Sequence, residues 1–159
     1  MTPNRDIDIL LVENDSSDAE LTIHTLRKNN LANSIQVVED GEEALDFLFC
    51  RSRYEDRSIL DRPKVILLDL KLPKIEGLEV LRALKNDVAT KAIPVVILTS
   101  SREPKDLLVG YRLGASAYVQ KPVDFDQFRQ TIREIGLFWI LLNQAPPIEA
   151  FETDPSVAG

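Results

Sequence analysis

Short runs of apolar residues alternate along this chain with longer segments in which apolar positions recur every three or four residues. The clearest run is Val-Ile-Leu-Leu at residues 65–68, which leads directly into Asp69. A continuous apolar run of this length is typical of a strand buried on both faces, as in a parallel sheet covered by helices. Similar or alternating patterns predict further strands at residues 8–12, 34–38, 95–99 and 117–120.

Helical periodicity follows each predicted strand. Helices are predicted over residues 18–29, after Asp40, after Gly77, over residues 103–113 and over residues 124–143, with caps at Ser17, Asp40 and Ser101 and a stop at Gly114. The polar stretch 51–63 has no period and is predicted to be a long loop. Alternation of strands and helices in this way predicts an α/β fold of three layers with right-handed crossovers.

Composition narrows the class of protein. The 159 residues suffice for one domain, predicted at residues 1–143, whereas residues 144–159 contain three prolines and are predicted to be a flexible tail. A net charge of −7 argues against a nucleic-acid binder, which needs a basic face. The single cysteine, Cys50, cannot form an internal disulfide, and no apolar run is long enough to span a membrane. We therefore expect a cytoplasmic protein that binds neither membrane nor nucleic acid.

Polar residues stand where the predicted strands end. Glu13 and Asn14 follow the first strand, Asp69 follows the third, Thr99 closes the fourth and Lys121 follows the fifth. Because the carboxyl ends of parallel strands share one edge of the sheet, these side chains are expected to converge. Any one of them alone is more simply a solvated loop residue or a strand terminus, so the indication of a site comes from their joint placement on four strands.

These residue types suit phosphoryl transfer. Two carboxylates with a nearby amide and a backbone carbonyl suit Mg²⁺, which neutralises the charge that accumulates when a phosphoryl group moves. Asp69 would be the nucleophile and form an aspartyl phosphate, while Thr99 and Lys121 would donate to phosphate oxygens. Positioning and charge stabilisation do most of the work in in-line transfer of this kind.

Four short motifs extend the pattern, namely VEND at residues 12–15, LDLKLP at 68–73, LTS at 98–100 and YVQKP at 118–122. Together with Gly77 and the spacings that separate them, they resemble the signature of response-regulator receiver domains over roughly residues 6–143. The resemblance implies a flavodoxin-like (βα)5 doubly wound parallel sheet with strand order 2-1-3-4-5. The polar insert before the third strand, the run at 93–101 and the pair Phe138-Trp139 look like phytochrome-associated single-domain response regulators of cyanobacterial type.

The resemblance also implies roles for the residues. Asp69 would receive a phosphoryl group from a histidine kinase, expected to be a phytochrome, and the protein would be a switch of a two-component system with only self-phosphorylation and self-dephosphorylation chemistry. Mg²⁺ would be held by Glu13, Asn14, Asp69 and the backbone carbonyl of Lys71. Thr99 and Tyr118 would form the switch pair that reports phosphorylation to the face built from the fourth helix, fifth strand and fifth helix. The peptide bond between residues 121 and 122 would be cis.

Asn14 departs from the family pattern, which has an acid at this position. An amide keeps an oxygen ligand but removes a full charge, so Mg²⁺ is expected to bind more weakly, by about 1–3 kcal/mol. Asp15 is a neighbour that could compensate. The alternative function is therefore a receiver-like adaptor with weak or no phosphorylation.

Two enzyme classes would share the topology, because fold alone does not decide function. A flavodoxin needs a first loop that cradles phosphate, whereas the segment 13–15, with the acids Glu13 and Asp15, would repel it. A phosphatase of the dehalogenase type needs its nucleophile after the first strand, whereas Asp69 follows the third.

The last predicted helix carries apolar residues on more than one face. One face that can pack on the sheet comprises Phe125, Phe128, Ile132, Ile135, Phe138, Trp139 and Leu142. Leu137, Ile140 and Leu141 lie on other faces of the final two turns, and a small sheet covers only one face of a helix. We therefore expect a homodimer through the fourth helix, fifth strand and fifth helix, with Phe138, Trp139, Leu141 and Leu142 in its interface, in preference to this segment folding back on its own domain.

Overall fold

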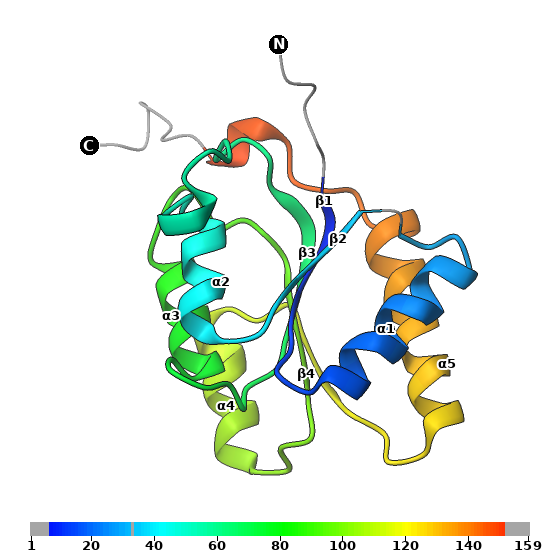
Figure 1. Ribbon diagram of the computed structural model, residues 1–159. Coiled ribbons are helices and arrows are strands. Elements are labelled where there is room, and N and C mark those ends of the chain that lie inside the picture. Colours follow the sequence, from blue (N-terminus) through cyan, green and yellow to red (C-terminus); the bar gives the residue numbers. More distant parts are fainter. Residues whose placement is uncertain (1–6, 33, 152–159) are drawn as a thin grey trace.

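A computed structural model of the protein describes residues 7–32 and 34–151 and contains a single five-stranded sheet within these ranges (Figure 1). The strands are β1 (Ile7–Val12), β2 (Ile35–Val38), β3 (Pro63–Leu68), β4 (Val95–Thr99) and β5 (Ala117–Gln120). All neighbouring strands pair in parallel, in the order β2-β1-β3-β4-β5. This order confirms the flavodoxin-like fold that the resemblance to receiver domains implies.

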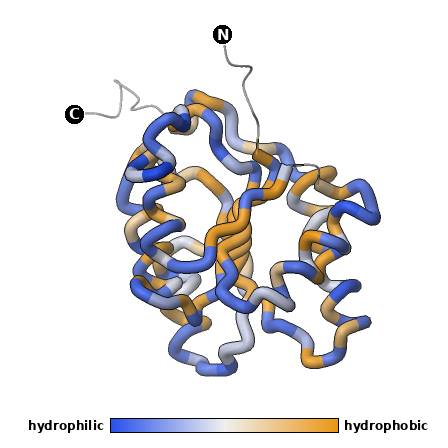
Figure 2. The backbone as a smooth tube through the Cα atoms, in the orientation of Figure 1, coloured by the Kyte–Doolittle hydropathy of each residue, from blue (hydrophilic) through white to orange (hydrophobic). Residues whose placement is uncertain are grey.

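Five helices cover the two faces of the sheet. They are α1 (Ser16–Lys28), α2 (Gly41–Leu48), α3 (Gly77–Lys85), α4 (Pro104–Leu113) and α5 (Phe125–Gly136). Helices α1 and α5 lie on one face, and α2, α3 and α4 lie on the other (Figure 1). Figure 2 shows the apolar strands at the centre of this arrangement.

Alternate residues of the central strands feed two separate cores. In β3, Ile66 and Leu68 pack in the core under α2 and α3, whereas Val65 and Leu67 pack in the core under α1 and α5. All four side chains are at most 1% exposed. The uninterrupted apolar runs in the sequence therefore arise because both faces of the central strands need apolar residues.

The helix boundaries follow local capping chemistry, with two corrections to the sequence prediction. Asp40 caps α2 as predicted, since its side chain accepts a hydrogen bond from the Glu43 backbone at 2.7 Å. Helix α1 begins earlier than predicted, because Asp15 and not Ser17 is its cap and accepts from the Asp18 backbone at 2.9 Å. Both acids stand near the amino end of a helix, where the helix dipole favours negative charge.

The second correction concerns α4. The residue at its N-cap is Glu103, which makes no side-chain capping bond, and Ser101 lies outside the helix. The Ser101 hydroxyl accepts from the Glu103 backbone at 3.3 Å and donates to Asp106 at 2.6 Å, so it braces the first turn from the preceding loop. Gly114 ends the helix as predicted, with a left-handed φ of 112° that glycine adopts without a steric penalty.

The segment between α2 and β3 is an ordered loop with one short 3-10 helix, η1 (Ser52–Tyr54). The guanidinium of Arg57 lies over the ring of Phe47 at 3.6 Å and donates to the carbonyl of Asp61 at 2.6 Å. These contacts fix the polar insert against α2.

Helix α5 continues into a π-helical segment, η2 (Leu137–Leu142), so the predicted end at Asn143 is confirmed while the winding differs. Trp139 and Ile140 are partly buried against the core under α1 and α5. The predicted packing face is wrong for Phe125, Phe138 and Leu142, which are exposed. In η2 the side chains that turn toward the core are those of Trp139 and Ile140, so Phe138 and Leu142 face outward.

The chain after Asn143 is only partly the flexible tail that its prolines predict. Residues Ile148–Phe151 form a 3-10 turn, η3, and the side chain of Phe151 is buried against the core under α2 and α3. The guanidinium of Arg62 lies 3.9 Å from the centre of its ring. The tail prediction is therefore wrong for η3, because one aromatic ring finds an apolar surface to cover; residues 152–159 lie outside the described residues.

The expected cis bond before Pro122 is also absent, since none of the peptide bonds in the described ranges is cis. The backbone N–H of Lys121 still donates to the Thr99 carbonyl at 2.7 Å, which extends the β4–β5 pairing by one residue. Proline then ends the strand because it has no N–H to donate.

Candidate functional site

The carboxyl ends of four strands bring the predicted site residues to one rim of the sheet. The backbone N–H of Asp69 donates to the Val12 carbonyl at 3.0 Å, which sets Asp69 beside the end of β1 and next to Glu13. Thr99 is the last residue of β4, and Lys121 follows β5. The rim lies at the lower edge of the sheet in Figure 1, where β1 turns into α1.

Asp69 is a buried carboxylate, 7% exposed, with a donor on each oxygen. Its Oδ1 accepts from the Thr99 hydroxyl at 2.9 Å and from the Lys71 backbone at 3.2 Å, and its Oδ2 accepts from Lys121 Nζ at 2.9 Å. Burial disfavours the charged form, but the neighbouring Glu13 carboxyl and the Lys121 ammonium outweigh burial and lower the pKa of Asp69. Asp69 is therefore an ionised, oriented carboxylate at neutral pH.

Lys121 is the central cation of the rim. Its Nζ lies 2.5 Å from Glu13 Oε1, 2.8 Å from Asp18 Oδ2 and 2.9 Å from Asp69 Oδ2, and its side chain is 8% exposed. Burial alone would lower the pKa of Lys121, but the hydrogen bonds that its ammonium donates to Asp18 and Glu13 raise it above its ordinary value. The ammonium is thus permanently charged and held by three carboxylates.

At Glu13 the effect of burial on the pKa outweighs the effect of the neighbouring ammonium. Burial of Glu13 raises the pKa of its carboxyl to about 7, against the pull of Lys121 in the other direction. In the metal-free protein Glu13 is therefore partly protonated near neutral pH.

Sequence reasoning missed Asp18 as a member of the site. It lies in the first turn of α1, where an acid is ordinarily explained by the helix dipole alone. Its contact with Lys121 joins residues 103 positions apart. The one feature of the sequence that could have indicated Asp18 is its position, one helical turn after the rim residues that follow β1.

Asn14 and Lys71, the other predicted metal ligands, line a hollow of about 460 Å³ at the rim, together with Glu76 and Asp106. Asn14 is exposed, and its side chain makes no hydrogen bond to another described residue. Asp15 does not replace the missing acid, because its side chain caps α1.

The oxygen donors at this rim fit a hard cation such as Mg²⁺. Two carboxylates, an amide oxygen and a backbone carbonyl are the ligand types that it prefers. No cluster of three or more His, Cys, Asp or Glu side chains suited to a metal occurs within residues 7–32 and 34–151. The fit therefore depends on the neutral oxygens of Asn14 and Lys71 as well as on the acids.

Tyr118 stands on β5, opposite Ile97 of β4. Its hydroxyl is buried and, within the described part of the chain, has no hydrogen-bond partner. Burial raises the pKa of this phenol. A buried donor without an acceptor is costly, so this hydroxyl stands to gain from any rearrangement that offers it one.

Thr99 is also tied to the loop that leads into α4. Its Oγ1 accepts from the Ser101 backbone at 3.3 Å, and the Ser101 hydroxyl donates to Asp106 of α4. A continuous series of hydrogen bonds thus links Asp69 to the first turn of α4.

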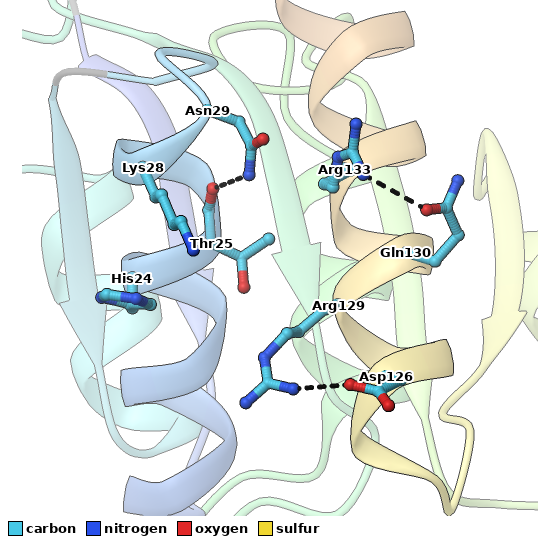
Figure 3. A pocket seen from close by; sticks show the side chains of 8 residues that line it. All are labelled: His24, Thr25, Lys28, Asn29, Asp126, Arg129, Gln130 and Arg133. Carbon is cyan, nitrogen blue, oxygen red and sulfur yellow. Dashed lines mark hydrogen bonds and ion pairs between the residues drawn. The ribbon is translucent and has the colours of Figure 1, made fainter.

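A second hollow, of about 440 Å³, lies away from the rim between α1 and α5 (Figure 3). It is lined by His24, Thr25, Lys28, Asn29, Asp126, Arg129, Gln130 and Arg133. Arg129 donates to Asp126 at 2.9 Å within this hollow. It contains none of the predicted site residues.

The end of the last helix presents apolar side chains to the surface. Leu137, Phe138, Leu141 and Leu142 are 46–61% exposed, whereas Trp139 is partly buried. The rings of Phe138 and Trp139 meet edge to face at 5.0 Å. Of the four predicted interface residues, three are therefore exposed, and Trp139, which is partly buried, contacts one of them, Phe138.

The fold and the rim together define a response regulator. Residues 9–133 match the profile of the response regulator receiver domain, and the chain belongs to this family, whose members are signalling switches. No helix in the described part of the chain is long and apolar enough to cross a membrane.

Among the relatives are the response regulator Rcp1 of Synechocystis, 35% identical over 83% of this chain and 88% of Rcp1, and the probable methanogenesis regulatory protein FilR2 of Methanothrix harundinacea, 36% identical over 87% of this chain and 86% of FilR2. The structure of a phosphorylated cyanobacterial phytochrome response regulator, RcpA, superposes with a TM-score of 0.83 at 34% identity and covers 90% of this chain and 100% of RcpA. A Mn²⁺-bound form of Rcp1 also superposes with a TM-score of 0.83, at 33% identity over 89% of this chain and 99% of that structure. The resemblance to phytochrome-associated single-domain regulators is thereby confirmed.

Proposed function

We propose that this protein is a phosphoacceptor response regulator that receives its phosphoryl group on Asp69. The observation that carries the proposal is the pair of donors on this buried carboxylate, Thr99 on one oxygen and Lys121 on the other. The lowered pKa of Asp69 keeps the carboxylate ionised and therefore nucleophilic.

In the proposed step a carboxylate oxygen of Asp69 attacks phosphorus, and the bond between phosphorus and the donor nitrogen of a phosphohistidine breaks. Lys121 and Thr99 are placed to donate to two phosphate oxygens as charge develops on them. Glu13, Asn14, Asp69 and the carbonyl of Lys71 would hold Mg²⁺, which when bound neutralises the charge of the phosphoryl oxygens.

The signal would leave the site through Thr99 and Tyr118. Phosphorylation adds nearly two negative charges and three acceptors to Asp69, which draws the Thr99 hydroxyl toward the new group. Tyr118 lies on the neighbouring strand β5, opposite Ile97, and its hydroxyl, unpartnered within the described chain, would gain from a new position that offers it an acceptor. The output surface would be the face formed by α4, β5 and α5.

The proposed phosphate donor is a histidine kinase, and specifically a phytochrome. Its support is the likeness to RcpA, described as a cyanobacterial phytochrome response regulator, over 90% of this chain. The net charge of −7 supports a protein partner over nucleic acid. A cytoplasmic location stays a prediction from the single cysteine.

We also propose that the protein forms a homodimer through Phe138, Trp139, Leu141 and Leu142. The exposed side chains of η2 form an apolar surface at the end of a helix, which a second copy would cover. Sedimentation velocity across a dilution series tests this, with Leu141→Glu expected to yield monomer. A wild-type protein that stays monomeric at every concentration would exclude the dimer.

Phosphorylation itself is tested with acetyl phosphate and MgCl2, followed by intact-mass measurement. The wild-type chain is expected to gain one phosphoryl group, and Asp69→Asn is expected to gain none. Asp61→Asn is the matched control, because Asp61 is an acid in the insert remote from the rim. No gain in the wild-type protein would favour the alternative, a receiver-like adaptor, for which the missing acid at Asn14 is the specific support.

A further inference from the structure

The amino end of α1 contributes a carboxylate to the rim that neither the predicted ligand set nor the switch pair includes. Asp18 Oδ2 lies 2.8 Å from Lys121 Nζ. The start of α1 at Ser16, fixed by the Asp15 cap, puts Asp18 in the first turn and so turns its side chain toward the rim. The Asp18 side chain is 27% exposed, so water screens this contact only in part.

The contact completes the bonding of the ammonium. Lys121 carries three N–H donors, and three carboxylates stand within hydrogen-bond distance of its Nζ. Two bonds leave an ammonium group free to turn about the line between its partners, whereas three partners on different elements fix its direction. Glu13 and Asp69 come from strand ends, and Asp18 comes from a helix, so the three directions differ.

The carboxylate of Asp18 also changes the net charge of the rim. Asn14 brings no charge, so with Glu13 ionised the rim would hold two carboxylates against one ammonium if Asp18 were absent. Asp18 adds one negative charge, so the net charge of the rim becomes minus two, which a divalent cation neutralises. It contributes through charge at a distance, since its carboxylate is engaged with Lys121.

We propose that Asp18 is a positioning residue of the phosphorylation site, which aims Lys121 at Asp69 and supplies the negative charge that Asn14 lacks. This inference rests on the proposed function of Asp69. When Asp69 carries a phosphoryl group, Asp18 and Glu13 continue to hold Nζ, and the third donor of the ammonium turns to a phosphate oxygen.

The proposed contribution of the Asp18 charge is tested by Mg²⁺ binding. MgCl2 is titrated by calorimetry into the variants Asp18→Asn and Asp18→Glu and into the control Glu20→Gln. Glu20 is an exposed acid of the same helix, so its loss removes the same charge away from Lys121. Asp18→Asn is expected to weaken Mg²⁺ binding about three- to tenfold, because a charge near a divalent cation is lost. Asp18→Glu and Glu20→Gln are expected to stay within about twofold of wild type, and Asn14→Asp combined with Asp18→Asn to regain the wild-type affinity.

The orientation of the Lys121 ammonium group is followed by nuclear magnetic resonance of its ¹⁵N-labelled Nζ. Slow proton exchange is expected in the wild-type protein and in Glu20→Gln, and faster exchange with a broadened signal in Asp18→Asn. A purely structural role of Asp18 in α1 would change the thermal midpoint without changing this signal.

Two results would overturn the inference. One is an Mg²⁺ affinity in Asp18→Asn equal to that of Glu20→Gln, and the other is an unchanged Lys121 signal in Asp18→Asn. Failure of the proposed function is seen separately, as a wild-type chain that gains no mass from acetyl phosphate, since neither measurement on Asp18 requires phosphorylation.

Discussion

The hydroxyl of Thr99 donates a 2.9 Å hydrogen bond to Oδ1 of Asp69, and both side chains are buried. Asp69 directly follows β3 and Thr99 ends the neighbouring strand β4, so the bond exists because β3 and β4 pair in parallel. The proposed switch residue, Thr99, and the proposed phosphoacceptor, Asp69, are thus in contact in the unphosphorylated protein.

Replacing Thr99 by valine should reveal what this bond contributes. Thr99→Val keeps the shape of the side chain and removes the donor, which leaves the buried Oδ1 with the Lys71 backbone N–H alone. We expect a loss of about 1–3 kcal/mol in the free energy of unfolding, measured in urea. Thr99→Ser keeps the hydroxyl and should lose less than Thr99→Val; equal stabilities of Thr99→Val and wild type would contradict a stabilising bond.

The stability of the metal-free protein should depend on pH through Glu13. The pKa of Glu13 rises from 4.5 to about 7 on folding, because burial disfavours the charged carboxylate. The folded state therefore holds a proton that the unfolded state releases, and the free energy of unfolding falls as pH rises from about 4.5 through 7. Urea titrations in EDTA should show about 1 kcal/mol less stability at pH 8 than at pH 6. Glu13→Gln should remove most of this difference, and a wild-type protein with no slope over this interval would refute it.

Restoring the acid at position 14 should tighten metal binding. Asn14 lines the hollow at the rim with an exposed side chain, so Asn14→Asp adds a charged ligand without disturbing the core. We expect about tenfold tighter Mg²⁺ binding by calorimetry, within the 1–3 kcal/mol that such a charge contributes. Gln130→Glu adds the same charge on α5 and should leave the affinity unchanged; an equal gain in both variants would attribute the effect to net charge alone.

Gly77 should not tolerate a side chain. A methyl group there would lie 2.4 Å from the carbonyl oxygen of Asp69 and 2.6 Å from Cα of Leu70, both of which are backbone atoms. Gly77→Ala must therefore displace the loop that carries Asp69, at a cost of about 1–3 kcal/mol. Urea unfolding measures the cost, and Gly136→Ala, whose methyl would meet only side chains of Leu26 and Leu31, should cost less. The opposite ranking would show that the Asp69 loop is more compliant than its packing indicates.

The sequence predicts the parts of this molecule that depend on short-range pattern. Strands β4 and β5 have the predicted bounds, because apolar residues and a following turn define them locally. The convergence at the rim was also predictable, since parallel strands share one carboxyl edge.

The parts it did not predict depend on contacts between distant residues. Asp18 and Ser17 are both reasonable first-turn residues, and only the contact with Lys121 distinguishes them. Phe151 is a single aromatic residue in a proline-containing segment, and its burial depends on a surface made by residues far earlier in the chain.

The turn η3 lies at the end of the molecule where the strands begin, opposite the rim that carries the candidate site residues (Figure 1). Arg62 holds it in place, with its guanidinium over Phe151 and its Nε donating to the Ala89 carbonyl at 3.1 Å. This brace lies where the strands begin, across the whole sheet from the carboxylates that surround Lys121. A fluorophore attached there in a Glu149→Cys variant, on the exposed side of the turn, would therefore give an optical reporter that leaves the proposed phosphorylation site untouched.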